Sequence, residues 1–320
     1  MKKLISVVVP AYNEEAVIKL FHFRISQVFN QLTNYRCEMI FVDDGSSDQT
    51  WQLVSNLSEI DNRVSAIALS RNFGKEAAMT AGLDYASGDA VAIFDVDLQD
   101  PPELLLQFIK KWEDGYDVVY AKRTHRDGES WLKKITASAF YRLMGILSRV
   151  SIPHDTGDCR LMSRRVVLAL GELREHHRYM KGLFAWVGYP SIAVEYRRDP
   201  RAAGTTSFNY WKLWNFALEG ITSFTITPLK LATYFGLFVA LMSFFMGAWI
   251  ILKTVIWGDV VQGYPSLVVA ILFFGGTQLF FIGILGEYIG RIFGEVKNRP
   301  LYLISDYKSA KTKKTFCEIF

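Results

Sequence analysis

The chain has 320 residues, of which half are apolar and 21% are charged, and its formal net charge is only +4. This length provides one or two domains with a buried core, and the small net charge, without a recognisable nucleic-acid-binding motif, excludes nucleic acid as the expected partner. The three cysteines, Cys37, Cys159 and Cys317, lie far apart in the sequence without metal-ligand spacing, so we interpret them as reduced residues outside any metal site.

Strand and helix patterns alternate through the first 120 residues. Short apolar runs rich in β-branched residues predict strands, and amphipathic stretches between them predict helices, the second of which has Ser47 or Asp48 as its N-cap. The predicted strands are 5–10, 38–43, 64–70, 90–95 and 117–123, and the predicted helices are 14–32, 47–60, 75–86 and 101–115. Such alternation predicts an α/β domain with a mostly parallel sheet and right-handed crossovers.

The middle of the chain is less regular. Residues 122–165 predict a basic, partly helical insertion, followed by a helix, a strand at 191–199 and a glycine turn at 201–207. The segment 208–224, "FNYWKLWNFALEGITSF", is rich in aromatic residues, as is typical of a helix lying at a membrane interface. An ordinary core helix is the alternative interpretation.

Two long stretches, 231–252 and 260–286, contain no charged residue. Each is long enough to cross the ~30 Å hydrocarbon core of a bilayer as a helix, and two buried core helices are the alternative. The N-terminus has no signal-peptide pattern, and the tail "YKSAKTKK" is basic, so we expect both termini on the cytoplasmic side of a membrane.

Polar residues follow four of the predicted strands. These strand ends read "PAYNEE", "DDGSSD", "SRNFGK" and "DVDLQD". Ligands of open α/β sheets bind beyond the carboxyl ends of the strands, so the four segments predict one shared site.

The last of these segments carries Asp95, Asp97 and Gln99 at every second position. Carboxylates two residues apart at a strand end can converge on one hard cation, and Mg²⁺ or Mn²⁺ with substrate phosphates is the natural ligand. The alternative is a solvated acidic turn in which Asp100 caps the next helix.

Five segments in this order resemble family 2 glycosyltransferases: "VVVPAYNEE", "FVDDGSSDQT", "SRNFGKEAAMTAGL", "FDVDLQDPPE" and "DTGDCRLMSRRV". The resemblance covers about residues 4–210, and more narrowly the chain resembles polyprenyl-phosphate hexosyltransferases of the dolichol-phosphate-mannose-synthase type. The two C-terminal charge-free stretches are similar to the bactoprenol glucosyltransferase branch, which modifies O-antigen.

The resemblance implies a GT-A nucleotide-sugar-binding fold and roles for individual residues. Asp97 and Asp158 would be catalytic, and Asp95, Asp97 and Gln99 would hold Mg²⁺ or Mn²⁺. The nucleotide sugar would contact Pro10, Tyr12, Glu14, Asp44, Lys75 and Asp95, and phosphate groups would contact Arg123, Arg126 and Arg201. One departure is Ser207, which stands where the family has a lysine, and Lys212 is the candidate to replace it.

The expected activity is transfer of one hexose, glucose from UDP-glucose, to undecaprenyl phosphate. We expect a transferase domain at 1–207, an interfacial region at 208–229, two spans at 230–290 and a basic tail at 291–320. A second copy of the chain, a flippase and a second glycosyltransferase are the expected partners. The alternatives are a processive polysaccharide synthase, which the absence of a Q-x-x-R-W motif disfavours, and a non-enzymatic protein that binds or flips lipid-linked sugar.

The expected acceptor is a phosphate monoester, whose second pKa of about 6 leaves it mostly ionised near neutral pH. A strong general base would add little, so Asp158 is expected to position the acceptor or the nearby cations, and the alternative is a turn-capping acid. The cations expected to offset the acceptor charge are Arg123, Arg126, Lys133, Lys134 and Arg201.

Overall fold

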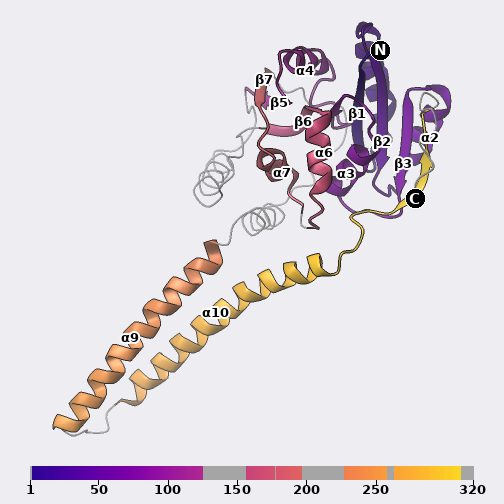
Figure 1. The fold of residues 1–320 in the computed structure, drawn as a ribbon. Helices are drawn as coiled ribbons and strands as arrows, with labels where there is room; N and C mark the ends of the chain where they lie inside the picture. Colours follow the sequence, from indigo (N-terminus) through magenta and orange to yellow (C-terminus); the bar gives the residue numbers. More distant parts are fainter. Residues whose placement is uncertain (1, 125–155, 177, 197–226, 258–262, 311–320) are drawn as a thin grey trace.

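One eight-stranded sheet combines seven strands from the first two thirds of the chain with an eighth strand near its C-terminal end (Figure 1). The computed structural model describes residues 2–124, 156–176, 178–196, 227–257 and 263–310. The strand order is β7-β5-β6-β4-β1-β2-β3-β8. The chain moves from β1 outward through β2 and β3, and then returns to the other side of β1 as β4. This reversal beside β1 is where an open α/β sheet forms its ligand crevice.

The central strands are parallel and buried on both faces. They are β1 (Leu4–Ala11), β2 (Arg36–Asp43), β3 (Val64–Leu69) and β4 (Ala90–Ile93). Their side chains alternate between two cores, since Val7 and Val9 pack on one face of the sheet while Val8 packs on the other. This double burial explains why the strands read as continuous apolar runs.

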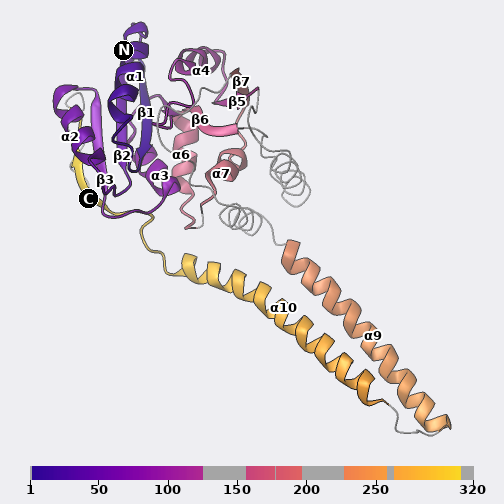
Figure 2. The same ribbon diagram turned by 180° about the vertical axis from the view of Figure 1, so that it is seen from behind.

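Helices cover both faces of the sheet (Figures 1 and 2). One core includes residues of α1 (Ile18–Gln31), α2 (Thr50–Ile60) and α4 (Leu104–Glu113). The other includes residues of α3 (Lys75–Tyr85), α6 (Arg164–Glu172) and α7 (Met180–Trp186). The four helices predicted in the first 115 residues are therefore confirmed. The predicted N-cap of α2 is wrong, because Gln49 rather than Ser47 or Asp48 occupies that position. Asp48 still stabilises the start of the helix, where its Oδ1 accepts a 2.9 Å hydrogen bond from the Thr50 N–H.

The predicted insertion is wrong at its C-terminal end. Residues Thr156–Ser163 form β6, which pairs antiparallel with β4 on one side and with β5 (Val118–Arg123) on the other. The edge strand β7 (Ser191–Tyr196) runs parallel to β5. The segment "TGDCRLMS" carries Asp158 and Arg160 among its apolar residues, so its pattern resembles a polar loop although Arg160 is buried. The sheet is consequently mixed.

Gly82 is the point of closest approach between α3 and the sheet. A Cβ atom added there would lie 2.1 Å from Val8 Cγ1 and 3.3 Å from Val42 Cγ2. We therefore expect Gly82→Ala to lower the free energy of unfolding by about 1–3 kcal/mol through overpacking. Gly171 in α6 is the matched control, because an added Cβ meets nothing within 4 Å and alanine there should be neutral or stabilise by about 0.5 kcal/mol. Denaturant unfolding of both variants tests this, and equal stability of the two would contradict the close packing.

A hairpin of two long helices extends away from the sheet domain (Figures 1 and 2). It consists of α9 (Thr227–Trp257) and α10 (Tyr264–Val296). Among the residues that the structure describes, no helix is classed as long and apolar enough for a membrane crossing. The expected interfacial segment 208–224 lies outside the described residues.

The expected basic tail is wrong in part, because the chain returns to the sheet after α10. Residues Ile304–Lys308 form β8, which pairs antiparallel with β3. Tyr302, Ile304 and Tyr307 pack against the core that contains α3. Charged residues obscure this strand in the sequence, although its backbone pairs with the otherwise open edge of β3.

Candidate functional site

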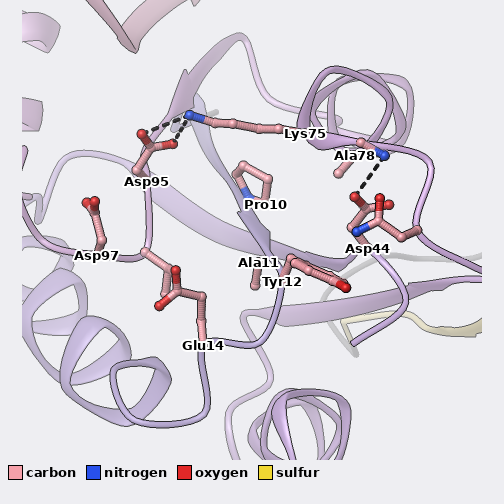
Figure 3. Close-up of a pocket in the computed structure, with 12 residues that line it drawn as sticks. Pro10, Ala11, Tyr12, Glu14, Asp44, Lys75, Ala78, Asp95 and Asp97 are labelled. Carbon is pink, nitrogen blue, oxygen red and sulfur yellow. Dashed lines mark hydrogen bonds and ion pairs between the residues drawn. The ribbon is translucent and has the colours of Figure 1, made fainter. Parts of the chain in front are cut away.

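A cavity of about 360 Å³ lies at the carboxyl ends of the central parallel strands (Figure 3). Its wall combines the end of β1, the start of the loop after β2, the loop before α3 and the segment after β4. The lining residues are Pro10, Ala11, Tyr12, Glu14, Asp44, Asn72, Gly74, Lys75, Ala78, Asp95, Val96 and Asp97. The four polar strand ends of the sequence thus meet at one site, as predicted.

The segment after β4 presents its acids to one side. Asp95 and Asp97 line the cavity and are partly exposed, whereas the intervening Val96 and the following Leu98 are buried. Leu98 has a φ of 59°, which is unusual for a residue other than glycine. The Gln99 N–H closes this turn by donating a 3.1 Å hydrogen bond to Asp97 Oδ1. Burial of the Leu98 side chain offsets the strain of this backbone conformation, which occurs directly after the two carboxylates.

Lys75 joins the cavity to Asp158 on β6. Its ammonium lies 2.7 Å from Asp95 Oδ1 and 2.6 Å from Asp158 Oδ2, and Figure 3 shows the side chain extended toward Asp95. Burial alone would lower the pKa of Lys75, but the two carboxylates outweigh burial and raise the pKa above its usual value. Burial would raise the pKa of Asp158, yet Lys75, Lys181 and Arg160 hold that pKa well below its usual range. Asp158 is therefore an ionised carboxylate and a weak base.

Asp44 forms the opposite wall of the cavity and is fixed by backbone groups. Its carboxylate accepts hydrogen bonds of 2.7 and 2.9 Å from the N–H groups of Phe73 and Gly74. The neighbouring Gly45 has a φ of 69°, and a Cβ atom there would lie 2.5 Å from the Arg71 carbonyl carbon. The loops after β2 and β3 are consequently packed against one another, so the orientation of Asp44 is set before any ligand binds.

Arg123 lies at the end of β5, in a second polar group. Its Nε donates a 3.2 Å hydrogen bond to the Tyr196 hydroxyl, which in turn donates to buried Asp100. A Cβ atom on Gly157 of β6 would lie 3.2 Å from Arg123 Nη2. The guanidinium therefore lies against β6, one residue before Asp158.

Three charged residues near Asp158 escaped the sequence analysis. Arg160 is buried, and its guanidinium donates to the carbonyls of Asp158 and Gly157 at 3.2 and 2.9 Å. Glu76 follows Lys75 on α3, and Lys181 lies on α7. Glu76 and Lys181 could not be recognised from the sequence, because a single charged residue on a short helix forms no motif. The packing of α3 and α7 in the fold brings these two residues near Asp158.

The structure therefore brings together most of the predicted site residues. Pro10, Tyr12, Glu14, Asp44, Lys75, Asp95 and Asp97 line the cavity, and Asp158 joins them through Lys75. Gln99 is described but does not line the cavity. Arg126 and Arg201 lie outside the described residues, together with Lys133, Lys134, Ser207 and Lys212.

Comparison with known proteins agrees with this arrangement. The family described as "Glycosyl transferase family 2" matches residues 6–171, and "GtrB C-terminal hairpin" matches residues 227–292. The chain belongs to glycosyl transferase family 2. It is a glycosyltransferase with a GT-A fold.

Its relatives match nearly the whole chain. A prophage-derived bactoprenol glucosyl transferase of Shigella flexneri is 52% identical over 94% of this chain and 97% of its own length. An uncharacterized glycosyltransferase of Synechocystis is 50% identical over 94% of this chain and 95% of its own length. Among solved structures, glucosyl-3-phosphoglycerate synthase from Mycobacterium tuberculosis aligns with a TM-score of 0.46 and 20% identity, covering 69% of this chain and 78% of that chain.

The donor set at the cavity of this glycosyltransferase fits a divalent cation that binds together with its substrate. Asp95 and Asp97 supply carboxylate oxygens, whereas no cluster of three or more acidic, histidine or cysteine ligands occurs among the described residues. Mg²⁺ is commonly held by one or two carboxylates together with substrate phosphates. Two carboxylates beside a cavity suit that mode and do not suit a preformed structural metal site.

Glu76 provides a pH-dependent prediction for the stability of this transferase. Burial and the nearby Asp158 raise its pKa from 4.5 to about 8, and its Oε2 atom is buried with no hydrogen-bond partner among the described residues. Because the folded-state pKa lies above the unfolded one, the folded state keeps a proton that the unfolded state releases. Stability should thus fall as pH rises from about 4.5 through 8.

We expect Glu76→Gln to remove much of this dependence and to be more stable than wild type above pH 8 by about 1–3 kcal/mol, the cost of a buried unsatisfied group. Denaturant unfolding between pH 5 and 9 measures it. Asp84→Asn is a control, because this acid lies on the same helix but forms a surface ion pair with Arg174. Parallel pH profiles for wild type and Glu76→Gln would contradict the assignment.

Proposed function

We propose that this protein transfers one glucose from UDP-glucose to polyprenyl phosphate, with inversion at the sugar carbon, to give a β-linked lipid-phosphate sugar. The observation that carries this proposal is identity of about half the residues to bactoprenol glucosyl transferases over nearly the full length of both chains. The cavity supports it, since carboxylates, a lysine and an exposed tyrosine meet at the carboxyl ends of the strands.

Each cavity residue has a role in this proposal. The Tyr12 ring, 46% exposed, would contact the nucleoside beside Pro10, and the fixed Asp44 carboxylate would accept hydrogen bonds from the base or ribose. Asp95 and Asp97 would hold Mg²⁺ or Mn²⁺, which when bound supplies positive charge to the diphosphate leaving group. Lys75 would bring a second positive charge to the same region while keeping Asp158 ionised.

We further propose that the hairpin of α9 and α10 inserts into the bacterial inner membrane, with the transferase domain and both termini in the cytoplasm. The stretches 231–252 and 260–286 carry no charge, and apolar side chains such as Phe238, Phe245 and Phe280 are exposed on the two helices. A hydrocarbon environment would bury such side chains. Placement at the membrane brings the transferase to its lipid acceptor.

The proposed product, a sugar linked to a lipid phosphate, requires further proteins that act after this enzyme. A sugar joined to a lipid phosphate on the cytoplasmic face needs a flippase to cross the bilayer. A second glycosyltransferase would then move the sugar to an envelope glycan such as O-antigen, and a second copy of this chain is a further proposed partner.

The activity is tested by incubating membranes that contain the protein with radiolabelled UDP-glucose and then extracting lipids. A lipid carrying one glucose is the expected product. A polymer would instead indicate a processive synthase, and the absence of incorporation together with retained UDP-glucose binding would indicate a non-enzymatic binding protein.

Membrane placement is tested separately with reporter fusions at residue 320 and near residue 258. We expect a cytoplasmic signal from the first fusion and a periplasmic signal from the second. A periplasmic reporter at residue 320 would refute the two-span arrangement, and two cytoplasmic reporters would indicate a hairpin that enters the bilayer without crossing it.

A further inference from the structure

The short helix α7 is held against β6 at the residues that flank Asp158. The Arg160 guanidinium stacks on the Phe184 ring at 3.6 Å from its centroid, and Met180 at the other end of α7 lies beside Glu76 of α3, whose pKa it lowers. Lys181 and Phe184 are three residues apart and therefore share one face of the helix. The contact between Phe184 and Arg160 thus places Lys181 on the side of α7 that faces β6.

Lys181 is a half-buried cation that no described residue engages through a hydrogen bond or salt bridge. Three other cations near Asp158 in the described part of the chain have partners: Lys75 pairs with Asp95 and Asp158, Arg160 donates to two carbonyls, and Arg123 donates to Tyr196. Burial lowers the pKa of Lys181, although the Asp158 carboxylate acts in the opposite direction. A partly desolvated ammonium of this kind is stabilised by binding an anion.

The nearby Glu76 forms no ion pair with Lys181 among the contacts of the described residues, and burial raises the pKa of its carboxyl group. Asp158 is already paired with Lys75 at 2.6 Å. Lys181 consequently leaves an excess of positive charge beside Asp158.

The position of Lys181 also separates it from the nucleotide-sugar cavity. Lys75 lines that cavity, whereas neither Asp158 nor Lys181 does. Lys75 therefore lies between the cavity and the group of charged residues around Asp158. An anion at Lys181 would lie next to the proposed donor site without occupying it.

We propose that Lys181 binds the phosphate monoester of the acceptor lipid beside Asp158. This inference rests on the proposed function and adds to it a residue that places the attacking phosphate next to the donor. An ammonium acts as a point charge toward phosphate, so it can hold a phosphate oxygen while another oxygen faces the sugar.

The test uses the full chain in detergent and a short-chain prenyl monophosphate as the probe. Dissociation constants for the probe and for UDP-glucose are measured for wild type, Lys181→Met, Lys181→Arg and Lys110→Met. Lys110 is an exposed lysine on α4 and serves as the control for loss of one positive charge.

We expect Lys181→Met to weaken prenyl monophosphate binding about tenfold to a hundredfold, which corresponds to loss of a hydrogen bond to a charged group. Lys181→Arg should retain most of the affinity, and Lys110→Met should match wild type. UDP-glucose binding should stay within about twofold in all variants, which also shows that each variant is folded.

Three results would overturn the inference: unchanged monophosphate binding in Lys181→Met, an equal loss of UDP-glucose binding, or no monophosphate binding by wild type. Failure of the proposed function is distinguishable from these results. Wild type would then bind the monophosphate through Lys181 and bind UDP-glucose, yet would transfer no glucose between them.

Discussion

Asp97→Asn is expected to reduce glucose transfer about a thousandfold, because a bound divalent cation contributes several kcal/mol of charge stabilisation in the transition state. Asp97 lines the cavity two residues after Asp95, and the amide would keep its size while removing the negative charge. The variant should also lose the metal-dependent part of its UDP-glucose affinity. Transfer assays and binding titrations, each with Mg²⁺, with Mn²⁺ and with excess chelator, measure both effects.

A matched control is Asp114→Asn, which removes an exposed acid that pairs with Lys111 on α4. Its activity and metal dependence should equal those of wild type. Full activity of wild type in excess chelator would contradict the metal assignment, and so would an Asp97→Asn variant whose UDP-glucose affinity still responds to metal.

The second large effect is expected for Asp158→Asn, which should lower kcat/KM about a hundredfold through misplacement of the reacting groups. Asp158 pairs with Lys75 at 2.6 Å, and the surrounding cations hold its pKa well below the usual range. A carboxylate of this kind stays ionised throughout the working pH range. It can therefore position Lys75 and the acceptor, but it is a poor acceptor of a proton.

A pH profile of kcat/KM separates positioning from base catalysis. If Asp158 positions the acceptor, the acidic limb should follow ionisation of the acceptor phosphate near pH 6 in wild type and in Asp158→Asn alike. Only the plateau value of kcat/KM should be lower in Asp158→Asn than in wild type. A variant in which the acidic limb disappears while the plateau falls would identify Asp158 as the general base.

Much of the fold was predictable because the spacing of apolar residues indicates the same strands and helices as the polar residues that end them. The first four strands are buried on both faces, so they appear as apolar runs, and each is followed by polar residues that meet at the cavity. Asp95 and Asp97 were predictable as cavity residues because they follow a buried strand, and ligands of open α/β sheets bind beyond the carboxyl ends of the strands.

Other features depend on long-range packing that a sequence pattern does not encode. β6 is flanked on both sides by antiparallel partners, and these partners make a strand of a segment whose aspartate and arginine suggest a loop. Lys181 faces β6 because Phe184, on the same face of α7, stacks on Arg160. Neither contact leaves a periodic signal in the sequence.

The return of the chain as β8 has a consequence for synthesis of the protein. β3 ends at Leu69, but the strand that covers its edge begins only at Ile304, after both helices of the hairpin. At ~5–20 residues per second, the nascent domain would carry an open edge for on the order of tens of seconds. An open edge is a template for pairing with other chains, so emergence of residues 304–308 from the ribosome protects the domain from aggregation. Ribosomes that stop before these residues would release a sheet whose β3 edge is open.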